Sequence, residues 1–140
     1  MNNTQKITIS LDINKTIDSV AAQCHVLALS SVEDFFVADI TSEIVKDSWV
    51  SLAIDLVSLV SGEVVITDEL MSMTLEVSGN STVTAQQLRL MAEKYVCADV
   101  IAEMYAGSKS VRETYSLWRD VARNNLLRAI CPMDIKPYRF

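Results

Sequence analysis

Residues 84–130 read TAQQLRLMAEKYVCADVIAEMYAGSKSVRETYSLWRDVARNNLLRAI, and this stretch decides the fold. It opens with Thr84 and, three residues later, Gln87, which is the spacing of a capping box. In that motif the threonine side chain accepts from the third helical amide and the glutamine side chain reaches back to the threonine amide. Apolar residues then recur at helical spacing as far as Tyr105, and Gly107 predicts the end of this helix.

A second helix is predicted from Ser110, because Ser110 and Glu113 again have the spacing of a capping box. Its apolar positions recur at helical spacing and are Tyr115, Trp118, Val121, Ala122, Leu126 and Ile130. Pro132 predicts the end of the helix. Since only a few residues separate the two helices, we expect 84–130 to form an antiparallel helix hairpin.

Two more helices are predicted upstream, over residues 16–29 and from residue 41 to about residue 61. The second has a wide apolar stripe, because Ile54, Val57 and Leu59 extend it beyond one face. Such a helix either lies at the centre of the core or presents a second face to a partner subunit.

Two segments instead have the period of strands. Residues 6–13 alternate strictly, and the residues on the apolar face are Ile7, Ile9, Leu11 and Ile13. Gly62 is expected to terminate the preceding helix. Residues 63–77 then predict a β-hairpin that turns around residues 67–69, and a short helix from Asp68 is the competing interpretation. The pattern does not say which strand pairs with 6–13.

We therefore predict a mainly α fold. It is a helical bundle with a C-terminal antiparallel helix hairpin and a minor β element, in a single domain over residues 1–131. Residues 132–140 hold both prolines of the chain and predict an extended arm. We expect this arm to dock on a partner through Met133, Ile135, Lys136, Tyr138, Arg139 and Phe140. The alternative is a tail that folds back over its own helix hairpin.

Charge is unevenly distributed along the chain. Eighteen acidic and twelve basic residues give a net charge of −6, which argues against a general nucleic-acid binder. The first 87 residues are strongly acidic, and the remainder is basic. We expect charged contacts between copies, and the predicted interface residues are Arg112, Arg119, Arg123, Glu43, Asp47 and Asp55. A phosphate-binding stripe and a simple solvated face are the other interpretations of the three arginines.

No pattern in the chain is typical of an enzyme. Cys24, Cys97 and Cys131 are widely spaced, and the one histidine, His25, is adjacent to Cys24. We therefore expect no catalytic residue, no metal site and no cofactor. A small hydrolase that uses Cys97 or Cys131 is the remaining enzymatic alternative.

One acidic pair and the N-terminus also bear on function. Asp99 and Glu103 are one helical turn apart and could share a cation, although a solvated or partner-facing pair explains them more simply. The N-terminal residues lack the features of a signal peptide, and the longest apolar stretch, residues 49–60, is shorter than a membrane span. We expect the chain to stay in the cytoplasm or in a particle assembled there.

The order of elements resembles that of bacteriophage head–tail connector proteins, also called adaptor or head-completion proteins. The matching stretches are residues 41–60, 87–105 and 115–130, and the likeness is one of pattern rather than of an invariant motif. The strand over 6–13 and the hairpin over 63–77 depart from the family pattern, because its members usually begin directly with a helix.

The resemblance implies a structural virion protein of the neck, with no enzymatic activity. It implies a ring of twelve copies that docks on the portal protein, contacts tail or neck proteins and lets DNA pass through its lumen without specific binding. The alternative from another class is a cytoplasmic helical regulator or chaperone-like protein that binds a partner as a dimer.

Overall fold

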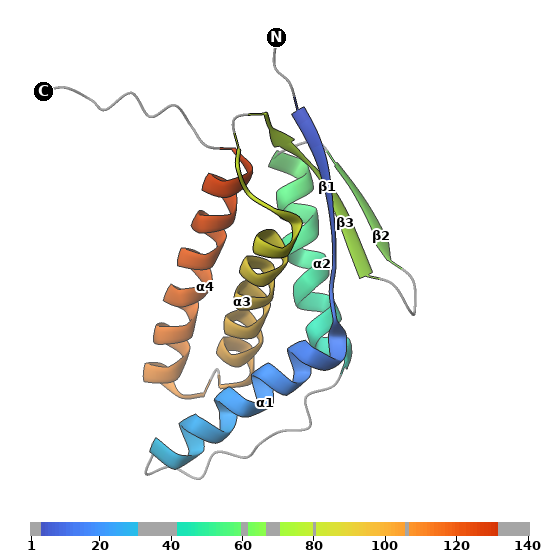
Figure 1. Ribbon diagram of the computed structural model, residues 1–140. Helices are drawn as coiled ribbons and strands as arrows, with labels where there is room; N and C mark the ends of the chain where they lie inside the picture. Colours follow the sequence, from blue (N-terminus) through green and yellow to red (C-terminus); the bar gives the residue numbers. More distant parts are fainter. Residues whose placement is uncertain are drawn as a thin grey trace, which may run out of the picture.

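The computed structural model describes residues 4–30, 42–59, 62–66, 71–79, 81–105 and 107–131 (Figure 1). In chain order the elements are β1 (Thr4–Ser10), α1 (Ile13–Ser30), α2 (Ser42–Leu59), β2 (Gly62–Ile66), β3 (Met71–Ser78), α3 (Ala85–Met104) and α4 (Lys109–Ile130). The predicted mainly α fold with a minor β element is confirmed. The predicted arm over 132–140 lies outside the described residues.

The three strands form one antiparallel sheet in the order β1-β3-β2. β2 and β3 are the predicted hairpin, and β3 begins at Met71, so this segment is strand rather than helix. β1 pairs with the other edge of β3, which places Ile9 opposite Met73. The alternating pattern did not say which strand pairs with β1. Its partner, β3, is more than 60 residues away in the chain.

The strand predicted over residues 6–13 ends earlier than expected. β1 ends at Ser10, and Ile13 is already the first residue of α1. The reason is Asp12, whose Oδ1 accepts from the Lys15 amide at 3.1 Å and whose carbonyl accepts from the Thr16 amide at 3.0 Å. Asp12 thus caps α1 and turns the chain out of the sheet, although the apolar alternation continues to Ile13.

The two predicted capping boxes have different outcomes. At α3 the box is present: Thr84 Oγ1 accepts from the Gln87 amide, and Gln87 Oε1 accepts from the Thr84 amide at 2.9 Å. At α4 the prediction is wrong, because Ser108 is the N-cap and makes no side-chain cap bond. The helix is already under way at Ser110, so the Ser110 side chain is in the wrong place to accept from the helix start.

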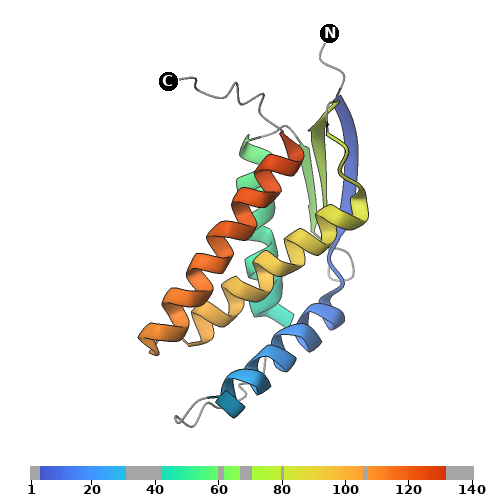
Figure 2. The same ribbon diagram turned by 60° about the vertical axis from the view of Figure 1, so that its left-hand side comes forward.

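The elements form two layers around one core. Apolar side chains of β3 point toward the helices, and the buried ones are Met71, Met73, Leu75 and Val77. On the opposite face of the sheet, Thr8 and Thr74 share a hydrogen bond of 2.8 Å. α3 lies at the centre of the helical layer and contacts α1, α2, α4 and β1 (Figures 1 and 2). Trp49 and Leu56 of α2 and Leu126 of α4 are fully buried.

None of the described helices is long and apolar enough to cross a membrane.

The helices differ in how completely the other elements cover them. On α4, Tyr115, Leu126 and Ile130 are buried as predicted, but Trp118 and Val121, predicted to share their apolar face, are about half exposed. On α2, Ile54 and Leu59 are also exposed. Of the three residues that widen the apolar stripe on α2, Val57 packs against the core, whereas Ile54 and Leu59 are exposed on different sides of the helix.

Candidate interaction site

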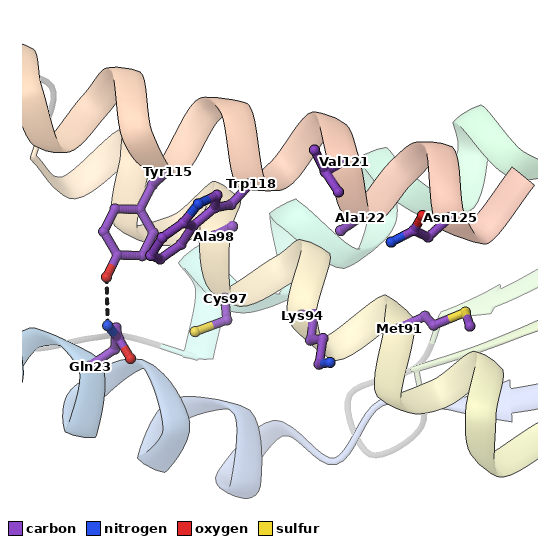
Figure 3. Close-up of a pocket in the computed structure, with 10 residues that line it drawn as sticks. All are labelled: Gln23, Met91, Lys94, Cys97, Ala98, Tyr115, Trp118, Val121, Ala122 and Asn125. Carbon is purple, nitrogen blue, oxygen red and sulfur yellow. Dashed lines mark hydrogen bonds between the residues drawn. The ribbon is translucent and has the colours of Figure 1, made fainter.

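A groove lies between α1, α3 and α4 on the face where Trp118 and Val121 are uncovered. Its cavity volume is about 460 Å³. The side chains that line this α1/α3/α4 groove are mostly apolar and are Gln23, Met91, Lys94, Cys97, Ala98, Tyr115, Trp118, Val121, Ala122 and Asn125 (Figure 3). Lys94 is the single charged residue among them. The groove combines an apolar lining with one cation, which suits a macromolecular or amphipathic partner more than a polar metabolite.

Two aromatic side chains form one end of the groove. The rings of Tyr115 and Trp118 meet edge to face, with centroids 4.7 Å apart and an interplanar angle of 66°. The Tyr115 hydroxyl accepts a hydrogen bond of 2.6 Å from Nε2 of Gln23 on α1 (Figure 3). Tyr115 is therefore fixed by α1, whereas Trp118 is 51% exposed. A half-exposed tryptophan braced by a second ring is typical of a binding hot spot.

The exposed apolar surface extends beyond the groove itself. Its neighbours on the three helices are exposed by 46–61% and are Val26 on α1, Leu90 on α3 and Leu117 on α4. Leu90 is one helical turn before Lys94, and Leu117 is one turn before Val121, so the patch is continuous with the groove. A contiguous apolar patch of this kind on a small protein marks an interaction surface.

Cys97 lines this groove, and Cys24 is buried beside it; both lie close to tyrosines. Burial and, to a smaller extent, the neighbouring Cys24 raise the pKa of Cys97 to about 11. Burial also raises the pKa of Cys24, which is hydrogen-bonded to Tyr105. Both thiols are protonated at neutral pH, and a protonated thiol is a poor nucleophile. Cys131, in contrast to Cys24 and Cys97, is exposed.

The residues described provide no metal site. No group of three or more histidine, cysteine or carboxylate side chains in the described part of the chain could hold an ion. His25 is exposed, whereas its neighbour Cys24 is fully buried, so the two side chains occupy different environments. Asp99 and Glu103 do not act as a pair, because Asp99 is bonded to Ser48 and Arg119.

Two of the three predicted interface arginines have carboxylate partners in their own chain. Arg123 makes a bidentate contact with Asp55 of α2, with distances of 2.6 Å from Nε and 3.2 Å from Nη2. Arg119 donates from Nη1 to Asp99 of α3 at 3.1 Å, and Ser48 of α2 donates to the same carboxylate at 2.7 Å. These contacts join α2, α3 and α4 on the side away from the groove. The pairing of Asp55 that we expected between copies is made within one chain.

The other predicted interface residues remain at the surface. Arg112, Glu43 and Asp47 are all exposed, and their contact with another copy stays a prediction. Glu43 and Asp47 belong to a stripe that runs along the exposed side of α2. We call this stripe the α2 outer face, and its exposed residues are Glu43, Asp47, Ser51, Ile54 and Ser58.

Sequence reasoning missed the α1/α3/α4 groove. It assigned Tyr115, Trp118 and Val121 to a single buried stripe, because all three recur at helical spacing. The signal that was present is the adjacent Leu117, which makes the apolar arc of α4 wider than one packed neighbour covers. The width of the arc indicates an uncovered shoulder, but it does not say which helix fails to cover it.

Taken together, the fold and the groove define an α-rich protein with a small antiparallel sheet and an exposed apolar groove between α1, α3 and α4. Comparisons of the chain with models of protein families, with curated proteins and with solved structures found no match.

Proposed function

We propose that the chain is a structural subunit of a bacteriophage head–tail connector, one copy in a ring that docks on the portal protein and joins capsid to tail. The observation that carries the proposal is that two separate faces of the molecule are unlike: one is apolar with a cation, and the other is acidic with one exposed isoleucine. One is the α1/α3/α4 groove with Trp118, and the other is the α2 outer face with Ile54. The resemblance in element order to the connector family supports the same function.

Two different interaction faces favour a ring over a two-fold dimer. A two-fold dimer uses one surface twice, whereas a ring uses two different surfaces that meet head to tail. A monomer gains nothing from exposing Trp118 by 51% and Ile54 by 59%, since each exposed apolar side chain costs free energy that burial would recover. Two such faces are what a ring subunit needs.

The charge of the chain supports the passage of DNA through such a ring. Tight DNA binding depends on basic side chains that neutralise phosphates and release counterions. The net charge here is −6, and Arg119 and Arg123 are already paired with carboxylates. A lumen built from this chain would repel phosphates weakly and let the duplex slide.

Sedimentation velocity of the full chain, alone and mixed with a candidate bacteriophage portal protein, tests the proposal. We expect a discrete large assembly that forms with the portal protein, and a ring in electron micrographs of that assembly. A chain that neither self-associates nor binds the portal protein contradicts the proposed function.

The predicted arm over 132–140 gives a second measurement in the same assay. A chain truncated after residue 132 should keep its thermal stability and lose portal binding, because the arm is expected to grip the portal rather than the core. A truncated chain that melts much lower and still binds shows instead that the tail belongs to the core.

The second candidate function is a regulator or chaperone-like protein that binds a partner as a dimer. The groove favours it, because an apolar groove with a cation at its rim suits an amphipathic helix of another protein. A stable closed dimer in the sedimentation experiment, without portal binding, would select this function over the connector.

A further inference from the structure

The α1/α3/α4 groove has one sign of charge at its edge. Lys94 is exposed and is the only charged residue among the described residues that line the groove. Arg128 lies one turn beyond Asn125 on the same side of α4 and is also exposed. The groove side therefore offers a half-exposed tryptophan at one end, and two cations toward the other end.

The opposite face of the molecule has the other sign. A shallow hollow of about 420 Å³ lies between α2 and the C-terminal half of α3, and each of its charged lining residues is a carboxylate: Asp47, Asp99 and Glu103. Arg119 already neutralises Asp99, so Asp47 and Glu103 are the ones that face solvent. Two turns beyond Asp47 on the α2 outer face, Ile54 is 59% exposed.

These two faces lie on opposite sides of α3. α1 and α4 flank the groove in the close-up view, and α2 runs behind α3 and α4 (Figure 3). The whole-molecule views agree, because α1 and α2 lie on different sides of α3 (Figures 1 and 2). The groove is apolar and basic, and the opposite face is acidic with one exposed isoleucine. Surfaces of opposite charge on opposite sides of one chain are the arrangement that head-to-tail association requires.

We infer that the α1/α3/α4 groove of one copy binds the α2 outer face of a second copy, with Ile54 directed at Trp118 and with Asp47 near Lys94. This inference rests on the proposed function and names the contact that builds the ring. It differs from the interface expected from the sequence. The acidic side, Glu43 and Asp47, is retained, but the basic side is formed by Lys94 and Arg128 instead of the arginines that pair within the chain.

A second copy is the occupant that explains both faces at once. A small ligand in the groove would leave Ile54 and the carboxylates of the α2 outer face without a role. Exposed charge pairs are weak one by one and are screened by salt, so the apolar contact supplies affinity and the charges set the register. Each copy has one groove and one α2 outer face, so copies can bind one another head to tail. A ring forms when the last copy binds the first.

Charge reversal tests the contact on the full chain, with association followed by sedimentation velocity over a concentration series. Lys94→Glu and Asp47→Lys should each weaken association by about tenfold or more, because each places like charges opposite one another. The double variant Lys94→Glu/Asp47→Lys restores opposite charges and should recover most of the affinity. Arg112→Glu is the matched control, since Arg112 is an exposed base of α4 outside the groove.

Ile54→Arg provides a test of the apolar part of the contact. It should abolish association, and the circular dichroism spectrum should be unchanged because Ile54 is exposed.

If the wild-type chain assembles and neither Lys94→Glu nor Ile54→Arg weakens assembly, the inferred contact is wrong and the connector function is untouched. If Arg112→Glu alone weakens assembly, the interface uses the other side of α4, which also overturns the inference. If the wild-type chain is monomeric in solution and forms a ring only on the portal, the same variants are tested in that ring, and a ring that neither Lys94→Glu nor Ile54→Arg weakens overturns only the inference. A wild-type chain that also forms no ring on the portal removes the proposed function.

Discussion

Gly62 is required because of a contact with a distant strand, which the neighbouring sequence does not reveal. Its position after an apolar helix suggested a helix terminator, but in the structure it is the first residue of β2 and lies opposite Leu75 of β3. A Cβ atom placed on Gly62 would collide with the carbonyl oxygen of Thr74 and would lie 3.3 Å from Val57. The absence of a side chain therefore lets β2 approach β3 beneath α2.

Gly62→Ala should lower the free energy of unfolding by about 1–3 kcal/mol, because backbone atoms must move to relieve the collision. Gly107→Ala is the matched control. A Cβ atom at Gly107 meets nothing within 4 Å, so this change should alter stability by less than about 0.5 kcal/mol. Urea denaturation of both variants measures the difference. Equal effects would show that the two glycines act through the unfolded chain rather than through the contact with Thr74.

Trp118 shows where reasoning about single residues from sequence stops. The helical period correctly placed Tyr115, Leu126 and Ile130 in the core, because these positions point at α3. It could not place Trp118, since burial of that position depends on α1. α1 reaches Tyr115 through Gln23 but leaves Trp118 uncovered. The distance that one helix extends over another is a tertiary property, and no spacing within α4 encodes it.

The helix ends provide a prediction at the scale of elements. Thr84→Ala should lower the free energy of unfolding by about 1 kcal/mol, because it removes the side-chain acceptor for the Gln87 amide. Ser110→Ala should be neutral or slightly stabilising, since Ser110 is inside α4 and alanine is the better helix former. Thermal or urea denaturation separates the two. A loss at Ser110 that matches the loss at Thr84 would mean that the predicted second capping box forms after all.

The ion pairs that join α2, α3 and α4 give a second prediction at this scale. Asp99 and Arg119 are 17% and 28% exposed, whereas Asp55 and Arg123 are 37% and 36% exposed. The Arg123–Asp55 pair has the shorter contact, but water screens it more. Double-mutant cycles with Arg→Met and Asp→Asn should therefore give a coupling on the order of 1 kcal/mol for Arg119–Asp99 and about 0.5 kcal/mol or less for Arg123–Asp55. The reverse order would show that bidentate geometry outweighs burial here.

At this scale the sequence was a good guide to which elements exist and a poorer one to where they begin. Apolar periodicity correctly predicted each described helix and the β2–β3 hairpin, because burial of one face imposes that period. The errors lie at starts set by single backbone and side-chain contacts. Asp12 rather than a later residue caps α1, and α4 begins at Lys109 with no side-chain cap at Ser108.

At the scale of the whole molecule, the contacts that define the site join segments far apart in the chain. The β1–β3 pairing, the Gln23–Tyr115 hydrogen bond and the Arg123–Asp55 pair each link the first half of the chain to a later segment. Local patterns predicted that these residues are apolar, polar or charged, but not which of them meet. The complementary faces proposed for ring assembly could therefore be recognised only once α3 was known to lie between α1 and α2.

The whole fold should also lose stability at alkaline pH, because its core holds several buried acids that ionise more easily in the unfolded chain. Burial raises the pKa of Cys97 to about 11 and that of Tyr105 to about 12, and it also raises the pKa values of Cys24, Tyr95 and Tyr115. The ordinary values are 9.0 for the thiols and 10.0 for the phenols.

Above these ordinary values the unfolded chain binds fewer protons than the folded one, so the free energy of unfolding falls as pH rises. The contribution of Cys97 is complete below about pH 9 and is lost as the pH rises through about 11, and that of Tyr105 is lost between about 10 and 12. Urea denaturation between about pH 8 and pH 10.5 should show the decline, with at most about 1.4 kcal/mol per pH unit from each group. Cys97→Ala removes one of these acids and should make the decline between about pH 9 and pH 10.5 shallower, whatever it costs at neutral pH. Stability that stays constant to pH 10.5, or a slope that Cys97→Ala leaves unchanged, would mean that water reaches these groups in the folded state.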